Sequence, residues 1–266
     1  MNKTPISVVI LTKNEEERIA DCIKSVYNWA DEVIVVDDES TDRTREIAKD
    51  LGAKVLVRKM DVEGRHRNWA YSKAKNSWIL SLDADERPTE ELKQEIAKVL
   101  FNPDCDSYTI PRRNYIGRKW LKWGGLYPSA QVKLFRKDKF RWKEENVHPE
   151  PSVKISCRQL KNDIIHYSYR NWQDYLRKLN NQTTLEAEKW FKLYEEDSKK
   201  ICHKMNLPHA LWRTLDRFVR VYIIKRGFMD GFYGFMVAYL SSIYQLISYA
   251  KFRQMKRNLH QWDRHE

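Results

Sequence analysis

Asp83 and Asp85 are the residues of this 266-residue chain whose type and spacing indicate chemistry most directly. They follow the apolar run 78–82, and side chains at positions i and i+2 of a strand point to the same side. Two convergent carboxylates are suitable ligands for Mg²⁺ or Mn²⁺, and these ions in turn bind diphosphates. The pair therefore predicts a metal site, provided that the strand geometry continues past Leu82.

The spacing alone is a weak signal, because the segment Asp104-Cys105-Asp106 has the same pattern. That segment follows Asn102-Pro103, which favours a turn. Only the elements that would position Asp83 and Asp85 can separate the two cases.

The first hundred residues alternate between strand and helix patterns. This order predicts an α/β fold with a mainly parallel sheet flanked by helices, and ligands of such sheets bind at the carboxyl ends of the strands. Strands are expected over 7–12, 32–36, 53–57 and 78–82, and helices over 15–30, before Gly52, over 66–76 and over 89–101.

Polar residues follow three of these strands, as that rule requires. Residues 12–15 follow the first strand, Asp37-Asp38 the second and residues 83–85 the fourth. Helix capping by Ser40 or Thr41 is the alternative interpretation, but it does not explain two aspartates directly after an apolar strand. We therefore favour a ligand site at this edge.

No glycine-rich phosphate-binding motif follows the first strand. This absence argues against a Rossmann dinucleotide site and against a P-loop NTPase. Phosphates would have to be held by a metal ion and by basic side chains, such as those in segment 64–68.

Charge is distributed unevenly along the chain. Residues 1–100 carry 17 Lys/Arg and 20 Asp/Glu, whereas residues 101–266 carry 32 and 17. The second part thus indicates an anionic partner, either nucleic acid, phospholipid or a phosphorylated substrate. A nucleic-acid-binding protein would not need acids at three strand ends, so we expect no nucleic acid. Four cysteines without a CxxC motif, and a start without an apolar signal region, are consistent with a reduced cytoplasmic protein.

The chain from residue 171 has a helical, basic pattern. Within it, residues 231–250 carry no charge, and Arg and Lys cluster on both sides. We expect a helix at a membrane surface, or a helical hairpin with 211–224, rather than a membrane span. The alternative is a buried core helix between solvated charges.

Several segments together resemble family 2 glycosyltransferases with the GT-A fold. They are Val-Val-Ile-Leu-Thr-Lys-Asn-Glu-Glu (8–16), Val-Ile-Val-Val-Asp-Asp-Glu-Ser-Thr-Asp (33–42), Arg67-Asn68 and Ser-Leu-Asp-Ala-Asp-Glu (81–86). Later segments resemble the branch of bacterial lipopolysaccharide-core β-glucosyltransferases. These are 131–136, Val147-His148, 165–169 and 225–231.

The resemblance implies an inverting transfer of a sugar, expected to be glucose, from a UDP-sugar. The implied acceptor is the lipopolysaccharide inner core or another anionic, lipid-linked saccharide. A transferase domain would span 1–170, with a nucleotide-binding half (1–101) and an acceptor half (102–170). Region 171–266 would associate peripherally with the inner face of the bacterial inner membrane.

The resemblance also implies roles for individual residues. The base and ribose would be held by Thr12, Asn14, Glu15 and one of Asp37 and Asp38. The diphosphate would lie near Arg67 and Asn68 and beside Asp83 and Ala84. The metal ion, Mn²⁺ or Mg²⁺, would be bound by Asp83, Asp85 and His166, with Asp85 the stronger candidate for direct coordination.

An inverting displacement needs one carboxylate that takes the proton of the acceptor hydroxyl. Glu144, Glu145 and Glu150 are the candidates, and Glu145 is our first choice. The chain departs from the branch here, because it has Val147-His148-Pro149-Glu150 where the branch has Val-His-Glu. It also has Lys133 where the branch often has Arg.

Three other functions remain open. A polyprenyl-phosphate glycosyltransferase would share the fold and the site. A sugar nucleotidyltransferase would share the layout but would carry a glycine-rich basic loop where this chain has Thr-Lys-Asn-Glu. An inactive membrane scaffold would keep the fold without the activity.

Overall fold

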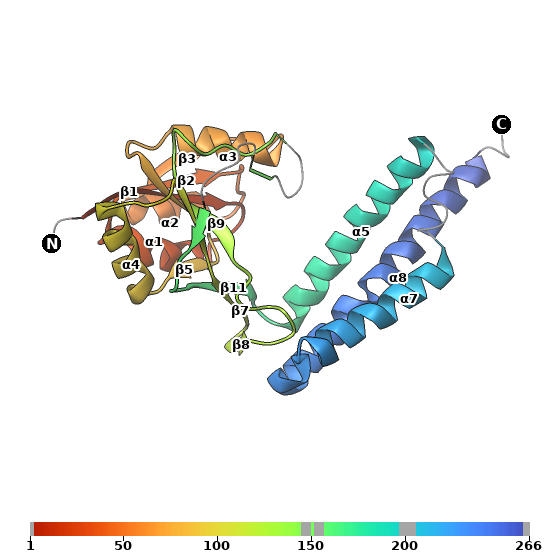
Figure 1. The fold of residues 1–266 in the computed structure, drawn as a ribbon. Helices are drawn as coiled ribbons and strands as arrows, with labels where there is room; N and C mark the ends of the chain where they lie inside the picture. Colours follow the sequence, from red (N-terminus) through yellow and green to blue (C-terminus); the bar gives the residue numbers. More distant parts are fainter. Residues whose placement is uncertain (1–2, 145–149, 152–156, 197–205, 263–266) are drawn as a thin grey trace. The chain divides into compact units, whose positions relative to one another are not determined.

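The computed structural model describes residues 3–144, 150–151, 157–196 and 206–262. The chain divides into two compact units (Figure 1). Unit 1 consists of residues 1–113 and 128–167, and unit 2 consists of residues 114–127 and 168–266.

Unit 1 is built on a seven-stranded sheet with the order β10-β6-β9-β4-β1-β2-β3. Strand β1 lies between β2 and β4 and runs parallel to both, and β3 is parallel to β2. Strand β9 runs antiparallel to its neighbours β4 and β6. The strands are β1 (Thr4–Thr12), β2 (Ala30–Asp37), β3 (Lys54–Val57), β4 (Trp78–Asp83), β6 (Ser107–Ile110), β9 (Gln131–Arg136) and β10 (Cys157–Gln159).

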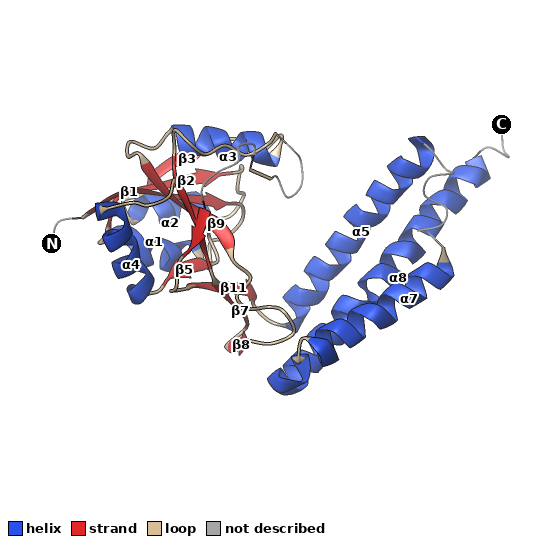
Figure 2. Ribbon diagram, viewed as in Figure 1, coloured by secondary structure: helices blue, strands red, loops and turns tan. Residues whose placement is uncertain are grey.

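Helices cover both faces of this sheet (Figure 2). Helices α1 (Ile19–Tyr27), α2 (Thr44–Asp50) and α4 (Glu90–Phe101) pack on one face, and α3 (Glu63–Ser72) packs on the other. Successive residues of β1 serve the two cores in turn, because side chains alternate along a strand. Val8 and Ile10 join the first core and Val9 joins the second. The predicted mainly parallel α/β sheet flanked by helices is confirmed.

The predicted bounds of three helices need correction. Helix α3 covers Glu63–Ser72 rather than residues 66–76. Helix α1 begins at Ile19 rather than at residue 15, and the N–H groups of Glu15 and Glu16 donate to Thr44 and Asp42. Helix α2 begins at Thr44, so the expected cap at Ser40 or Thr41 is wrong. Both residues instead bind the loop that follows β1.

Two further strand pairs complete the β structure. In unit 1, β5 (Glu86–Pro88) runs antiparallel to the start of β11 (Ile164–Tyr169). In unit 2, the end of β7 (Arg112–Ile116) forms a hairpin with β8 (Lys119–Leu121).

Unit 2 combines that hairpin with long helices. They are α5 (Trp172–Glu196), α7 (Leu207–Phe218) and α8 (Gly231–Trp262), and the π-helix η1 (Val219–Ile224) and the 3₁₀ helix η2 (Gly227–Asp230) join the last two. Ile116 and Leu121 of the hairpin share a core with Leu179 of α5 and Leu240 of α8. The hairpin thus belongs with the helices, although residues 114–127 were expected in the acceptor half of the first domain.

The uncharged segment 231–250 lies within α8. Its Val237 and Leu240 are buried in unit 2, whereas Phe232 and Tyr239 are exposed. Helices α7 and α8 pack together, in agreement with the expected hairpin. Among the described residues, none of the helices combines the length and the apolar character needed to cross a membrane.

Leu82 offers a test of the unit 1 core. Its side chain is fully buried beside the acidic end of β4. We expect Leu82→Ala to lower the free energy of unfolding by about 2–5 kcal/mol, because it removes buried methyl groups and leaves a cavity. Leu185→Ala on α5, whose side chain is 58% exposed, should change it by less than about 1 kcal/mol. Urea unfolding followed by far-UV circular dichroism measures both, and equal losses would contradict this packing.

Candidate active site

The carboxyl ends of β1, β2 and β4 meet at one edge of the sheet. Thr12 at the end of β1 is paired with Asp37 at the end of β2. On the other side, Leu11 is paired with Asp83 at the end of β4. The structure therefore brings the three predicted polar strand ends side by side, as expected for an α/β sheet that binds a ligand there.

Asn14 joins the loops after β1 and β2. Its φ of 53° lies in the left-handed region, which asparagine tolerates better than most residues. Its backbone N–H donates to Ser40 Oγ at 2.8 Å, and its Oδ1 accepts from the backbone N–H of Thr41 at 2.8 Å. Glu15 continues this connection through its backbone N–H, which donates to Thr44 Oγ1 at 2.8 Å. Asn14 thus fixes the shape of this edge.

Asp37 and Asp38 have different surroundings. Asp37 is fully buried, and its two oxygens accept from the backbone N–H and the hydroxyl of Ser40 at 2.8 and 2.5 Å. Asp38 accepts from Lys13 Nζ at 2.8 Å and from the Met60 backbone N–H at 2.7 Å. Burial raises the pKa of Asp38, but these two donors outweigh it and leave the pKa below its usual range. Both aspartates therefore support the loops around the edge.

Thr12 carries a buried hydroxyl, Oγ1, for which the described residues offer no hydrogen-bond partner. Buried polar atoms are nearly always satisfied by protein, water or ligand. The hydroxyl is therefore suited to a polar ligand at this edge.

Asp83 lies between two cations. Its Oδ2 is 2.9 Å from Lys133 Nζ, and its Oδ1 is 3.8 Å from a guanidinium nitrogen of Arg67. Burial raises the pKa of Asp83, but the charges of Lys133 and Arg67 outweigh it and hold the pKa well below its usual range. Asp83 is therefore ionised at neutral pH.

Glu86 and Lys133 form the centre of this charge cluster, although our interpretation of the sequence did not place Glu86 in the site. Glu86 is fully buried, and its Oε2 accepts from Lys133 Nζ at 2.6 Å and from the Asp83 backbone N–H at 3.0 Å. Its other oxygen faces Arg112 at 3.4 Å. A signal was present, because Glu86 directly follows the Asp-Ala-Asp segment and Lys133 departs from the usual Arg.

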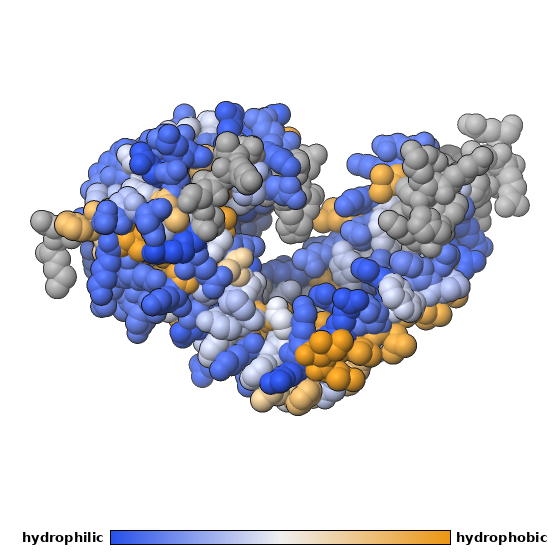
Figure 3. All heavy atoms as spheres, in the orientation of Figure 1, coloured by the Kyte–Doolittle hydropathy of each residue, from blue (hydrophilic) through white to orange (hydrophobic). Residues whose placement is uncertain are grey.

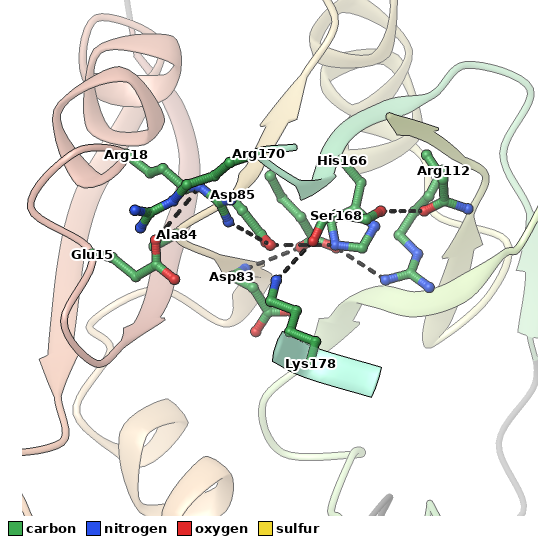
Figure 4. Close-up of polar contacts among 12 residues, drawn as sticks. Glu15, Arg18, Asp83, Ala84, Asp85, Arg112, His166, Ser168, Arg170 and Lys178 are labelled. Carbon is green, nitrogen blue, oxygen red and sulfur yellow. Dashed lines mark hydrogen bonds and ion pairs between the residues drawn. The ribbon is translucent and has the colours of Figure 1, made fainter. Parts of the chain in front are cut away.

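Asp85 faces a different set of partners (Figure 4). Its Oδ2 lies 3.3 Å from Arg18 Nη1 and 3.5 Å from His166 Nε2. Burial raises the pKa of Asp85, but His166 and Arg18 outweigh it, so the pKa is lowered. The Asp85 carbonyl accepts from the Tyr167 backbone N–H at 2.9 Å, which fixes β11 beside this turn. The structure thus brings His166 to Asp85 from a point 81 positions further along the chain.

Ala84 has a buried methyl group between the two aspartates, and its carbonyl accepts from Arg87 at 3.4 Å. The backbone turn at Ala84 directs Asp83 towards Lys133 and Asp85 towards His166. Both carboxylates lie at the edge of the sheet, but they are engaged by different cations.

Arg67 and Asn68 occupy neighbouring positions on α3 but make different contacts. Arg67 bridges Glu63 at 2.9 Å and Asp83 at 3.8 Å. Burial lowers the pKa of Arg67, but Tyr71, Asp83 and Glu63 outweigh it and raise it, so the guanidinium stays charged. The Asn68 amide both donates to the carbonyl and accepts from the N–H of Trp142, each at 2.9 Å. Asn68 therefore attaches the segment around Trp142 to α3.

The predicted base candidates lie in and beside the segment that follows Trp142. Glu144 is exposed and accepts from Arg65 Nε at 2.9 Å. Glu150 is exposed and accepts from Lys143 Nζ at 2.8 Å, which lowers the pKa of Glu150. Glu145 lies outside the described residues.

The donor set fits Mn²⁺ or Mg²⁺ in kind. Asp83 and Asp85 are ionised oxygen donors, and the imidazole of His166 is next to Asp85. The described part of the chain has no group of three or more His, Cys, Asp and Glu side chains that would enclose an ion. Asp83, Asp85 and His166 are therefore not gathered into one set of three ligands in the described residues.

An acidic site lined by cations at the carboxyl edge of a parallel sheet is typical of α/β enzymes that bind nucleotides. The family model described as Glycosyl transferase family 2 matches residues 7–160. An uncharacterized glycosyltransferase of Rickettsia typhi is 31% identical in an alignment that covers 94% of this chain and 87% of that protein. The chain therefore belongs to glycosyl transferase family 2.

Two further likenesses are more distant. The lipopolysaccharide core biosynthesis glycosyltransferase LpsC of Rhizobium meliloti is 24% identical over 95% of this chain and 93% of its own. A crystal structure of glucosyl-3-phosphoglycerate synthase from Mycobacterium tuberculosis contains Mn²⁺, UDP and glucosyl-3-phosphoglycerate. It matches 50% of this chain and 57% of its own at 20% identity, with a TM-score of 0.40. A score at this level carries no ligand over to this chain.

The predicted family and enzyme class are confirmed. The protein is a glycosyltransferase.

Lys133 can be tested through stability. We expect Lys133→Met to lower the free energy of unfolding by about 3–5 kcal/mol, because it leaves Glu86 buried and without its nearest cation. The matched variant Lys143→Met, which removes an exposed partner of Glu150, should leave the free energy of unfolding nearly unchanged.

The pH dependence gives a second readout for Lys133. A lowered carboxyl pKa contributes stability that is present above the unfolded pKa, near 4, and is lost as the pH falls through the folded pKa. Since Asp83 has such a pKa, the difference in stability between wild type and Lys133→Met should shrink as the pH falls below about 4. Urea titrations at pH 7 and pH 3 would detect this, and a difference that stays constant would contradict the assigned ion pair.

Proposed function

We propose that this glycosyltransferase moves a sugar, expected to be glucose, from a UDP-sugar to a phosphorylated, lipid-linked saccharide. The proposed acceptor is the lipopolysaccharide inner core, reached at the inner face of the bacterial inner membrane. The observation that carries the proposal is the ionised pair Asp83 and Asp85 at the carboxyl edge, with Arg18, Arg67 and Lys133 around it. This edge combines negative ligands for a metal ion with positive charges for a diphosphate.

The nucleoside would bind over the ends of β1 and β2. The buried Thr12 hydroxyl supports this assignment because a polar ligand would satisfy it. Asn14 and Asp37 would act mainly by holding the two loops, since their side chains already bond Thr41 and Ser40. Glu15 and Asp38 remain candidates for direct contact with the base and ribose.

The diphosphate would lie near Asp83 and Asp85. Mn²⁺ or Mg²⁺, when bound by Asp85 with Asp83 or His166, would neutralise charge on the leaving phosphate. Arg67 would add fixed positive charge beside it, because its guanidinium is held by Glu63 and stays protonated. Asn68 would contribute by attaching the segment around Trp142 to α3.

The transfer itself would be a single displacement. The acceptor oxygen forms a bond to the anomeric carbon while the bond from that carbon to the diphosphate oxygen breaks. The electron pair leaves with UDP, and a carboxylate takes the hydroxyl proton. Glu145 remains our first choice for this base, because Glu144 and Glu150 are each paired with a cation.

The acceptor proposal rests on charge and on one relative. The basic excess of residues 101–266 favours an anionic acceptor. The relative LpsC is named for lipopolysaccharide core biosynthesis. A phosphorylated polyprenyl carrier would satisfy the same charge requirement, so the assay must include both acceptors.

Asp85→Ala tests the metal site. With UDP-glucose, Mn²⁺ and lipopolysaccharide truncated at the inner core, the rate should fall about a hundredfold or more, because the leaving diphosphate loses its metal anchor. Asp106→Ala is the matched control, since Asp106 occupies the equivalent place in the second Asp-x-Asp segment and is 4.0 Å from Arg136. It should keep nearly the wild-type rate.

Binding and acceptor choice separate the possible failures of that assay. Calorimetric titration with UDP should show Mn²⁺-dependent binding for wild type and none for Asp85→Ala. Full activity in Asp85→Ala would overturn the metal assignment. Transfer to polyprenyl phosphate in place of lipopolysaccharide would keep the donor site and overturn the proposed acceptor.

The catalytic base is tested by a series of isosteric changes. Glu144→Gln, Glu145→Gln and Glu150→Gln each remove one candidate base without much change in shape. We expect Glu145→Gln to lower kcat by about a hundredfold or more, with UDP binding preserved, because general bases contribute on that scale. Wild-type rates in all three variants would mean that the base lies elsewhere in the chain.

A further inference from the structure

Unit 2 exposes a set of large apolar side chains on α7, η1, η2 and the start of α8. We call this set the apolar face. Figure 3 shows apolar colour gathered at the turn between α7 and α8. Its members are each 40–68% exposed: Leu207, Leu211, Trp212, Leu215, Ile223, Ile224, Phe228, Met229, Phe232, Phe235 and Tyr239.

The spacing of these residues is helical. Leu207, Leu211 and Leu215 are four positions apart on α7, so they form one stripe. The pattern continues from η2 into the start of α8, with residues spaced four, three and four positions apart at 228, 232, 235 and 239. The opposite side of α8 is buried in the core of unit 2 through Val237 and Leu240. A helix segment that is apolar on both sides requires a second apolar surface against it.

The turn that carries the tip of this face is rigidly built. Arg226 has a φ of 56°, and Gly227 passes so close to η1 that an added Cβ would lie 2.6 Å from the Val221 carbonyl oxygen. Gly234 is packed more closely still, because a Cβ added there would lie 1.8 Å from the Gly227 carbonyl oxygen. The buried Asp230 carboxylate accepts from the Trp123 backbone N–H at 2.8 Å. Ile223, Ile224, Phe228 and Met229 are therefore held outward by fixed backbone.

Exposed cations lie on the same elements as the apolar face. Arg213, Arg217, Arg220, Lys225 and Arg226 are all exposed. Of the two acids between residues 207 and 239, Asp216 pairs with Arg220 at 2.7 Å and Asp230 is buried. Among the described residues, no carboxylate lies within 4.0 Å of the other four cations. The tip of the face, where Lys225 and Arg226 lie between Ile224 and Phe228 in the chain, thus has a positive rim.

This combination selects the partner. A second copy of this chain, related by a twofold axis, would bring two positive rims together, because such an interface buries the same patch of both copies. An anionic lipid surface instead offers headgroups to the rim and an acyl boundary to the apolar side chains. We propose that the apolar face of unit 2 inserts into one leaflet of a membrane rich in anionic lipid.

The inference extends the proposed function, since a lipid-linked acceptor is reached at such a surface. It can nevertheless fail or hold independently, because binding to vesicles requires neither donor nor acceptor. The slow hydrolysis of UDP-glucose with Mn²⁺ reports on the donor site without any membrane.

The test is flotation of the full-length protein with lipid vesicles. The probe is a vesicle of phosphatidylglycerol and phosphatidylethanolamine, compared with phosphatidylcholine alone. Wild type should float with the anionic vesicles. The variant Ile224→Ser/Phe228→Ser/Met229→Ser should bind at least tenfold more weakly, because it removes the apolar tip. The matched control Leu185→Ser/Leu193→Ser, which changes exposed leucines of α5, should float like wild type.

A charge variant separates the two components. Lys225→Gln/Arg226→Gln should weaken binding to anionic vesicles by at least tenfold and should reduce its sensitivity to salt. Each variant is checked by circular dichroism, and if the triple variant is misfolded, Ile224→Ser and Phe228→Ser are tested singly by the same criterion. Wild-type flotation of the apolar variants, or absence of wild-type flotation, would overturn the proposal. A dimer that these variants dissociate, without vesicle binding, would assign the face to a second copy and would also overturn it.

Discussion

The buried ion pair between Lys133 and Glu86 is the interaction on which the rest of the site depends. Glu86 is fully buried, and an isolated carboxylate in that position would cost several kcal/mol. Lys133 neutralises the charge of Glu86 from β9, the strand that pairs antiparallel with β4. Because the same ammonium also faces Asp83, the placement of β9 fixes the charge at the end of β4. The electrostatics of the site therefore depend on the strand order of the sheet.

The edge of the sheet combines support with binding capacity. Hydrogen bonds of Asn14, Asp37 and Ser40 hold the loops after β1 and β2 together. These bonds restrict the conformation of the backbone at this edge. Against this fixed edge, Asp83 and Asp85 stay ionised because cations outweigh their burial. Preorganised charge of this kind stabilises a developing diphosphate without rearrangement during the reaction. This is the physical basis of the sugar transfer proposed for this family member.

Unit 2 differs from this charged edge, because its notable surface is apolar. Its core is closed by the hairpin and the long helices, yet a second set of large apolar side chains stays at the surface. The glycines and Asp230 around the turn hold that set in place, so its exposure is a property of the fold. Two exposed cations of the basic second part, Lys225 and Arg226, lie beside the tip of this set.

The sequence by itself determined the continuous apolar runs and the helical patterns, and therefore the strands and helices of the first hundred residues. It also placed Thr12, Asp37 and Asp83 at strand ends, which parallel pairing then brought side by side. Local pattern could not reveal that α1 would begin only at Ile19, or that the N–H groups of Glu15 and Glu16 would donate to Thr44 and Asp42.

Only the tertiary structure decided which cation meets which carboxylate. Lys133 and Glu86 lie 47 positions apart, and His166 meets Asp85 through pairing of β11 with β5. Such contacts depend on strand order and register, and no short window of sequence contains them. The physical reason is that burial of charge is settled by the whole fold, whereas periodicity is settled residue by residue.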